Sequence, residues 1–369
     1  MPKAATLLPI FLLCLAATLS WPGQGSAAEP REREQSLEQM NLRYQAEVAA
    51  EAMKEGVPFS GEKKLERNGY TILFLPKLLY VDNDALESMG DARSLKSGGG
   101  HTKGFGAGVL VFRKINDWAT LGLAYDYVHA EYSGGATLFG GAVSSPQGEL
   151  TFDGKSDERT DSHAFSLIFN SDLKDYGRFY LTLTQAFDYF DGQETQETWL
   201  NGARVASDQR DIDSRIRMTA LTPFYELDFP LSDELTLVPY VGLNLTYTDN
   251  AGLNNFQTED GHLSTYSWTH FLLGGASLKY RQGLFGAHVR GGFSKTFYGD
   301  KIPGYVTRVL APGVIQSGYN VDADKGVFSA GAGLSYVIPE VGVLGLDYNG
   351  VYGNNVQGHT ATFSLVIPF

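Results

Sequence analysis

The chain is short of cysteine, of long apolar runs and of basic residues. Its one cysteine, Cys14, lies in the N-terminal apolar segment, so the rest of the chain offers no disulfide, thiol nucleophile or cysteine metal site. Beyond that segment, no apolar run reaches the roughly 20 residues that a transmembrane helix needs. Lysine and arginine total 29 against 42 acidic residues, and the net charge of -13 leaves no basic stripe for nucleic acid. These shortages argue against a helical membrane protein and a nucleic-acid-binding protein.

The N-terminus has the layout of a secretory signal peptide. Lys3 supplies a positive charge, residues 4–19 are almost wholly apolar, and Ser26, Ala27 and Ala28 are small residues suited to cleavage. We therefore predict a cleaved signal peptide over residues 1–28 and export of the remainder.

Residues 29–60 are predicted to contain one helix and a linker. Apolar residues at helical spacing follow a capping box formed by Ser36 and Gln39, and Gly56 ends the pattern. The apolar stripe consists of Leu37, Met40, Tyr44 and Val48. The helix is expected over residues 31–55, and its other faces are charged, with Glu38, Glu47 and Glu51 among them.

After residue 69 the apolar spacing changes to a period of two, within a predicted barrel domain that covers residues 61–369. In the last predicted strand, one face carries Phe363, Leu365, Ile367 and Phe369, and the other carries Thr360, Thr362 and Ser364. The second face is polar or small in several other segments too, which suits a barrel lumen better than the core of a sandwich. The 43 glycines, 20 tyrosines and 22 phenylalanines also favour a membrane barrel. The sequence therefore predicts an all-β, antiparallel transmembrane β-barrel, with a secreted soluble sandwich or β-helix as the alternative.

Twelve strands are predicted, with ten or fourteen left open, and their connections alternate between short and long. The strands cover about 69–81, 104–115, 118–132, 159–171, 177–190, 211–229, 234–249, 264–281, 284–298, 323–338, 341–353 and 357–369. The long connections are 82–103, 133–158, 191–210, 250–263 and 299–322. Short periplasmic turns and long external loops are typical of the outer membrane of Gram-negative bacteria, which is the expected location.

The C-terminal segments resemble the autotransporter β-domain family in rhythm and in the placing of glycine and tyrosine. The matching segments are Gly333-Leu334-Ser335-Tyr336, residues 344–350 and residues 363–369. The resemblance implies a barrel that assembles with periplasmic chaperones and the barrel-assembly machinery in outer-membrane lipid. The alternating face of Phe363, Leu365, Ile367 and Phe369 is similar to the family's assembly signal. Only residues 29–68 lie between the predicted signal peptide and the first strand, so we expect a solitary barrel without a passenger.

Charged residues on the polar faces are expected to line the lumen. They are Asp126, Asp188, Arg215, Arg217, Lys279, Arg290 and Asp347. Such charges are tolerated in a barrel where the lumen is wet or the charges pair. One hypothesis threads the helix into the lumen, where its glutamates pair with Arg215, Arg217 and Arg290. The alternative is a helix that lies in the periplasm or at the membrane surface.

No catalytic, cofactor or metal site is predicted. Ser162 and His163 are adjacent, and Asp126 and His129 are an odd number of residues apart, so each pair points to opposite faces of its strand. We therefore expect a plugged pore or a scaffold for surface loops whose partner the sequence does not identify. A porin-like open diffusion channel is the alternative, and an outer-membrane hydrolase is a weaker one.

Overall fold

A computed structural model of the chain describes residues 70–83, 87–90, 93–139, 150–253, 263–299, 303–310, 313–320, 326–339, 341–353 and 356–368. The predicted signal peptide, the predicted helix with Glu38, Glu47 and Glu51, and Phe369 lie outside these residues. Within the part of the chain that the structure describes, no helix is long and apolar enough to cross a membrane.

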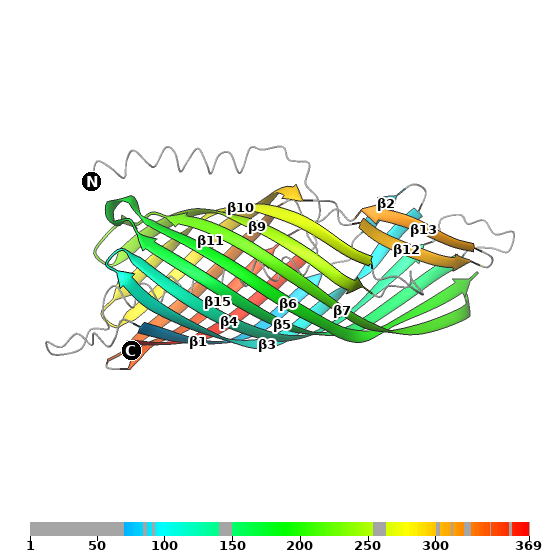
Figure 1. Cartoon of the computed structure of the whole chain (residues 1–369), viewed down its shortest axis with the longest axis horizontal. Coiled ribbons are helices and arrows are strands. Elements are labelled where there is room, and N and C mark those ends of the chain that lie inside the picture. The colour runs from blue at the N-terminus through cyan, green and yellow to red at the C-terminus, as the bar shows by residue number, and fades with distance from the viewer. Residues whose placement is uncertain are drawn as a thin grey trace.

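Twelve antiparallel strands form a closed barrel (Figure 1). They are β1 (Tyr70–Asn83), β3 (Arg93–Asn116), β4 (Ala119–Phe139), β5 (Leu150–Asp172), β6 (Arg178–Leu200), β7 (Ala203–Glu226), β9 (Leu235–Leu253), β10 (Leu263–Gln282), β11 (Phe285–Gly299), β14 (Gly326–Ile338), β15 (Gly342–Tyr352) and β16 (Val356–Pro368). Each strand pairs with its neighbour, and β1 closes the ring by pairing with both β3 and β16. Closure gives every barrel strand a partner on both sides at the level of the ring, and β7 continues beyond β9, since their pairing begins only at Arg215.

Four short strands and one helical turn lie outside the ring. β2 (Glu87–Gly90) pairs with β3, and β8 (Phe229–Pro230) pairs with β9. β12 (Pro303–Leu310) and β13 (Gly313–Asn320) form a separate hairpin. The turn of 3₁₀ helix η1 (Lys174–Tyr176) connects β5 to β6.

Alternation along each strand sorts the side chains onto an inner and an outer face. In β1, Leu73 and Leu75 are buried, whereas Phe74 and Leu78 are 43% and 64% exposed. The same division holds in the last strand, where Thr360 and Thr362 are buried and Phe363 is 46% exposed. The outer face is therefore rich in exposed apolar side chains, as the alternation of the sequence predicted.

The inner face is more apolar than the sequence pattern suggested. At one end of the barrel, where β1 begins and short turns join the strands, nine buried residues form one cluster. We call this the short-turn end, and the residues are Leu73, Leu75, Leu110, Phe112, Ala124, Ile168, Val337, Val343 and Val366. Tyr180, Phe224 and Tyr240 form a second cluster at the same end. We call these twelve side chains the apolar collar. They come from β1, β3–β7, β9 and β14–β16, so the prediction of an inner face with few large hydrophobic residues is wrong at this end.

The two ends of the barrel differ in their connections. β1 begins and β16 ends at the short-turn end, at the left of Figure 1. At the other end, β6 and β7 form a hairpin that extends to the right of the figure, with Asn201 and Gly202 as its two-residue turn. Both turn residues have positive φ, 48° and 79°, as a type I′ turn requires.

All five predicted long loops are partly strand, since 250–263 include the end of β9 and 299–322 include the β12–β13 hairpin. Residues 191–210 form the β6–β7 hairpin, 133–158 include the end of β4 and the start of β5, and 82–103 include the start of β3. The reason is that backbone pairing continues where the apolar alternation has faded. Residues of β5 and β6 stay in register from Leu150 opposite Leu200 to Asp172 opposite Arg178.

Candidate functional site: the two faces of the barrel wall

A buried ion pair spans the inner face between β1 and β4. Lys77 and Asp126 are in direct contact across β3, and their side chains are 5% and 6% exposed. The strand between them carries Gly106 and Gly108 at this level. A Cβ atom would lie 3.0 Å from Lys77 Cε at Gly106, and 3.1 Å from Asp126 Oδ1 at Gly108. The glycines therefore make room for a charge pair that bridges two strand spacings.

The same arrangement recurs on another part of the wall, between β11 and β15. Arg290 donates from Nε and Nη2 to Asn349 Oδ1 at 2.9 and 2.5 Å, and its Nη2 lies 3.7 Å from Asp347 Oδ1. His288 Nε2 lies 3.1 Å from the same Asp347 oxygen. Gly331 and Gly333 of β14 lie beneath these side chains. In both places, polar side chains from two strands meet above a pair of glycines on the strand that separates them.

Other inward charges also have partners on the wall. Ser162 Oγ donates to Asp188 Oδ1 at 2.5 Å. Arg178, near the short-turn end, lies 3.3 Å from Glu226 Oε2 and 2.7 Å from Asp228 Oδ1, and Glu226 is fully buried. Lys279 is in register with the inward His288. Five of the seven charges predicted for the lumen therefore lie on the inner face: Asp126, Asp188, Lys279, Arg290 and Asp347.

Arg215 and Arg217 lie on the outer face, so their predicted place in the lumen is wrong. In β7 the even-numbered Met218 and Ala220 are buried, and the odd-numbered positions point outward. Arg217 is opposite the outward Phe187, and Arg215 is opposite the exposed Tyr189. The inference from sequence took every polar face as an inner face. On β7 the outer face is itself polar at this level, so that rule does not apply.

The outer face of β3–β10 is layered along the barrel axis. One row of directly opposed aliphatic residues consists of Val111, Leu123, Leu167, Leu183, Leu221 and Leu245. Further from the short-turn end comes an aromatic band, made of Tyr125, Phe165, Tyr247, Trp268, Tyr127, His163 and Phe187. Its rings are in contact, with centroids 5.0–5.2 Å apart in the Tyr125–Phe165, Tyr127–His163 and Tyr247–Trp268 pairs. The outward side chains therefore change from aliphatic to aromatic with increasing distance from the short turns.

Beyond the aromatic band lies a row of alternating charges. Lys103 is opposite Glu131, Glu131 is opposite Arg159, and Arg159 is opposite Asp191. We call these four residues the charge ladder. All four side chains are exposed on the outer face. Opposite charges directly across neighbouring strands stabilise the pairing by about 0.2–1 kcal/mol each.

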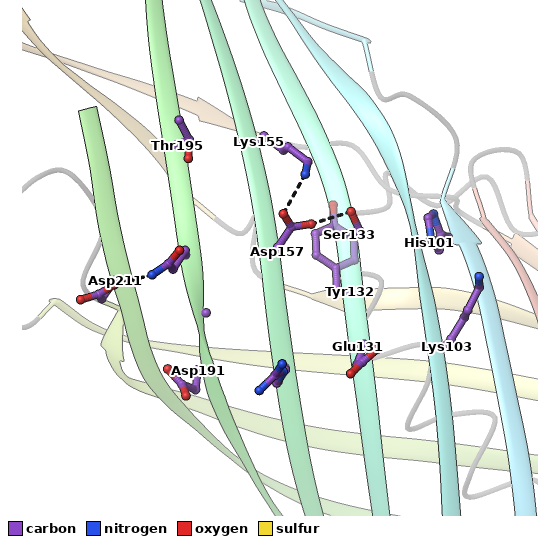
Figure 2. A pocket seen from close by; sticks show the side chains of 13 residues that line it. His101, Lys103, Glu131, Tyr132, Ser133, Lys155, Asp157, Asp191, Thr195 and Asp211 are labelled. Atoms are coloured by element: carbon purple, nitrogen blue, oxygen red, sulfur yellow. Dashed lines mark hydrogen bonds and ion pairs between the residues drawn. The ribbon is translucent and has the colours of Figure 1, made fainter. Parts of the chain in front are cut away.

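A hollow of about 640 Å³ lies over the charge ladder and the strand positions beyond it (Figure 2). Figure 2 shows Asp157 between Lys155 and Ser133, which donate to it at 2.8 and 2.6 Å. These hydrogen bonds, first from Lys155 and then from Ser133, hold the pKa of Asp157 below its ordinary value. His101, Tyr132, Gln193 and Asp211 also line the hollow. The sequence analysis did not identify this site.

The pairs considered for catalysis point to different faces. Ser162 lies inside with Asp188, whereas His163 Nδ1 lies 2.9 Å from Tyr125 Oη outside. His129 Nδ1 contacts Asp161 at 2.9 Å on the outer face, while Asp126 is buried on the inner face. Among the described residues, no group of three or more His, Cys, Asp or Glu side chains could hold a metal ion.

The residues of the predicted assembly signal lie on the strand that closes the barrel. Phe363 is exposed on the outer face of β16, and Leu365 and Ile367 are half-buried on the same face. β16 pairs on one side with β15 and on the other with β1.

No protein-family model matches the sequence, and no curated protein matches it. Among solved structures, the chain is similar to the translocator domain of the autotransporter NalP from Neisseria meningitidis. The TM-score is 0.52 at 12% sequence identity, and the alignment covers 89% of this chain and 96% of that one. The fold is that of an autotransporter translocator domain.

Two further autotransporter structures show weaker similarity to the barrel. The transport unit of AIDA-I from Escherichia coli gives a TM-score of 0.46 at 9% identity, covering 87% of this chain and 98% of that one. The β-domain of the Bordetella autotransporter BrkA gives 0.45 at 10% identity, covering 79% and 98%. The assignment of the fold rests on the NalP comparison.

Proposed function

We propose that the chain is an outer-membrane β-barrel that anchors an extended β-sheet at the cell surface. The observation that carries this proposal is the layering of the outer wall. The aliphatic rows are bounded by the aromatic band on one side and, near the short turns, by exposed aromatic residues that include Trp118, Tyr176 and Tyr336. Aromatic girdles at both interfaces are characteristic of membrane barrels.

The height of the apolar zone supports the proposal. Residues Trp118 and Tyr127 of the β4 hairpin belong to the two aromatic levels. The strand between them rises about 30 Å at about 3.3 Å per residue, which is about 23 Å along the axis at a tilt of about 40°. An outer-membrane barrel presents an apolar band about 25 Å tall. The wall therefore matches one membrane thickness.

The strands beyond the aromatic band form the proposed surface sheet. From Phe187 to Leu200, β6 continues for about 40 Å at about 3.3 Å per residue. Its outward residues there are mainly polar or charged, which disfavours contact with lipid tails. The paired charges and the apolar collar leave the lumen a less suitable place for transport of polar solutes, so we favour a surface scaffold over a porin-like channel.

Cysteine labelling in intact cells would test this orientation. The chain has one cysteine, and it lies in the predicted signal peptide, so single cysteines can be introduced without a background thiol. Asn201→Cys, at the tip of the β6–β7 hairpin, should react with a membrane-impermeant maleimide on intact cells. Asp117→Cys, in the short β3–β4 turn, should react only after the outer membrane is permeabilised. The reverse pattern, or equal labelling of both, would contradict the proposal.

A second candidate function is a pore that the N-terminal segment closes. Of the three arginines first paired with its glutamates, only Arg290 faces inward, and it is bound by Asn349. The observation that still supports a plug is the apolar collar, which lines the lumen on ten of the twelve barrel strands at the end where β1 begins. We propose that the apolar stripe of residues 31–55, rather than Glu38, Glu47 and Glu51, packs against this collar.

Conductance in planar bilayers separates these alternatives. The mature protein should be closed, and deletion of residues 29–60 should open it, whereas a triple variant with Glu38→Gln, Glu47→Gln and Glu51→Gln should stay closed. Equal, open conductance with and without the segment would indicate a diffusion channel. The absence of conductance in both would favour the surface scaffold alone.

A further inference from the structure

We propose that the outer wall just beyond the aromatic band binds the phosphorylated headgroups of surrounding lipids together with the divalent cations that bridge them. The site consists of the charge ladder, the hollow over it, and Arg215 and Arg217 on β7. This inference rests on the proposed function, because it requires the aromatic band to lie at the external edge of the membrane.

The position of the site selects a lipid headgroup over a soluble ligand. Tyr127 belongs to the aromatic band, and Glu131 of the charge ladder lies four residues further along β4. This separation is about 13 Å along the strand and less along the barrel axis. Polar headgroups extend over a few ångströms to about 8 Å beyond each side of the hydrocarbon core. The ladder therefore lies at or just above the headgroup level of the adjoining leaflet.

The cationic side chains have the reach and geometry that phosphate needs. Lys103, Arg159, Arg215 and Arg217 are all exposed on the outer face. Arg215 and Arg217 lie nearest the aromatic band, opposite Tyr189 and Phe187. Long stems of this kind lie along apolar surface while their charged ends reach the headgroups, and a guanidinium can bind a phosphate through two parallel hydrogen bonds.

The carboxylates indicate a ligand that also carries positive charge. Glu131 stands between Lys103 and Arg159, and Asp191 is opposite Arg159. Asp161 and Asp249 lie on the same face near the arginines. Asp161 is opposite Tyr189, which is itself opposite Arg215, and Asp249 is opposite Arg217. A surface with both signs suits phosphates cross-linked by Mg²⁺ or Ca²⁺, which bind carboxylate and phosphate oxygens together. A purely anionic headgroup would fit this surface less well.

The shape of the wall supports the same conclusion. A barrel wall is convex on its outside, but here the hollow of about 640 Å³ interrupts it (Figure 2). Lys103, Glu131 and Asp191 reach it from β3, β4 and β6, and Figure 2 shows them along its margin. A headgroup with more than one phosphate can therefore contact several strands at once.

Lipid binding by the refolded, full-length mature protein tests the inference. The probe is diphosphoryl lipid A, added in detergent with Mg²⁺, and the lipid retained through gel filtration is measured by mass spectrometry. We expect retention that falls about tenfold with Arg159→Ala and Arg215→Ala together, since two charge-assisted phosphate contacts are removed. Retention should fall similarly when dephosphorylated lipid A replaces the probe or when EDTA replaces Mg²⁺.

Two further variants serve as controls. Arg113→Ala with Lys114→Ala removes two cations from β3 near the short turns, and retention should be unchanged. Glu131→Gln with Asp191→Asn should weaken the dependence on Mg²⁺ while the dependence on phosphate remains.

Equal retention of phosphorylated and dephosphorylated lipid, or by the arginine variant and the parent, would overturn the proposal. Retention that is independent of Mg²⁺ in the parent protein would overturn its divalent-cation part. Failure of the parent to insert into vesicles, seen as no heat-dependent shift in gel mobility, would instead count against the membrane barrel itself.

Discussion

At the residue scale, glycines decide where polar side chains can lie on the inner wall. Gly106 and Gly108 lie beneath the Lys77–Asp126 pair, and Gly331 and Gly333 lie beneath the Arg290, His288 and Asp347 group. The abundance of glycine was apparent from the sequence, as was the inward direction of Asp126, Arg290 and Asp347. Which charge meets which was not, because each partner lies two strands away in the sheet and many residues away in the chain.

Substitution of Gly333 tests this role of glycine. A Cβ atom at Gly333 would lie 2.2 Å from His288 Cε1 and 2.7 Å from Asp347 Oδ1, so one side chain must move and weaken their contact. We expect Gly333→Ala to lower the free energy of unfolding in urea by about 1–3 kcal/mol, as overpacking commonly does. Gly291→Ala is the matched control, since its nearest neighbour is Phe328 Cζ at 4.0 Å. Equal effects of the two substitutions would refute the proposed role.

At the element scale, the strands are more regular than their apolar pattern. The sequence located the membrane-level part of each barrel strand, because there the outer face meets an apolar surrounding and alternates clearly. It missed the continuation of β4–β7, where outward residues such as Lys155, Arg159 and Asp191 are charged. A usable signal did exist, since Asn201-Gly202 is the dipeptide that type I′ hairpin turns favour.

The β6–β7 turn should be sensitive to loss of glycine for a conformational reason alone. Gly202 has a φ of 79°, and a Cβ atom there would meet nothing within 4 Å. We expect Gly202→Ala to cost about 1 kcal/mol locally and to speed proteolytic cleavage at the hairpin tip several-fold. The melting temperature of the barrel should not change, as circular dichroism would show. A lower melting temperature would mean that the hairpin is part of the cooperative barrel.

At the scale of the whole molecule, the apolar collar is a property of the closed ring. Its twelve side chains come from ten barrel strands and form two clusters, because the short turns bring one end of these strands to the same end of the barrel. Buried apolar side chains at a narrow level of a channel exclude water and oppose the passage of ions. The collar is therefore expected to limit the conductance of the pore that opens when residues 29–60 are removed.

Polar substitutions in the collar should raise the conductance. Leu110 and Phe112 are 0% and 1% exposed and lie two residues apart on the inner face of β3. In the protein without residues 29–60, Leu110→Asn with Phe112→Asn should increase single-channel conductance several-fold, because water can then enter the collar. Val109→Asn, on the outer face of the same strand, should leave the conductance unchanged. No difference between the two variants would show that the collar does not limit ion flow.

The sequence by itself determined the class of the fold and the outward face of most strands, and it favoured twelve strands while leaving ten or fourteen open. These features follow from alternation along single strands, which is a local property that twelve segments repeat. Only the tertiary structure showed which charged side chains pair above the glycines of an intervening strand, and that Arg215 and Arg217 face outward. It alone also revealed the apolar collar and the charge ladder. Each of these features depends on the register between strands and on the height of a residue along the barrel axis. The residue pattern within a single strand specifies neither of them.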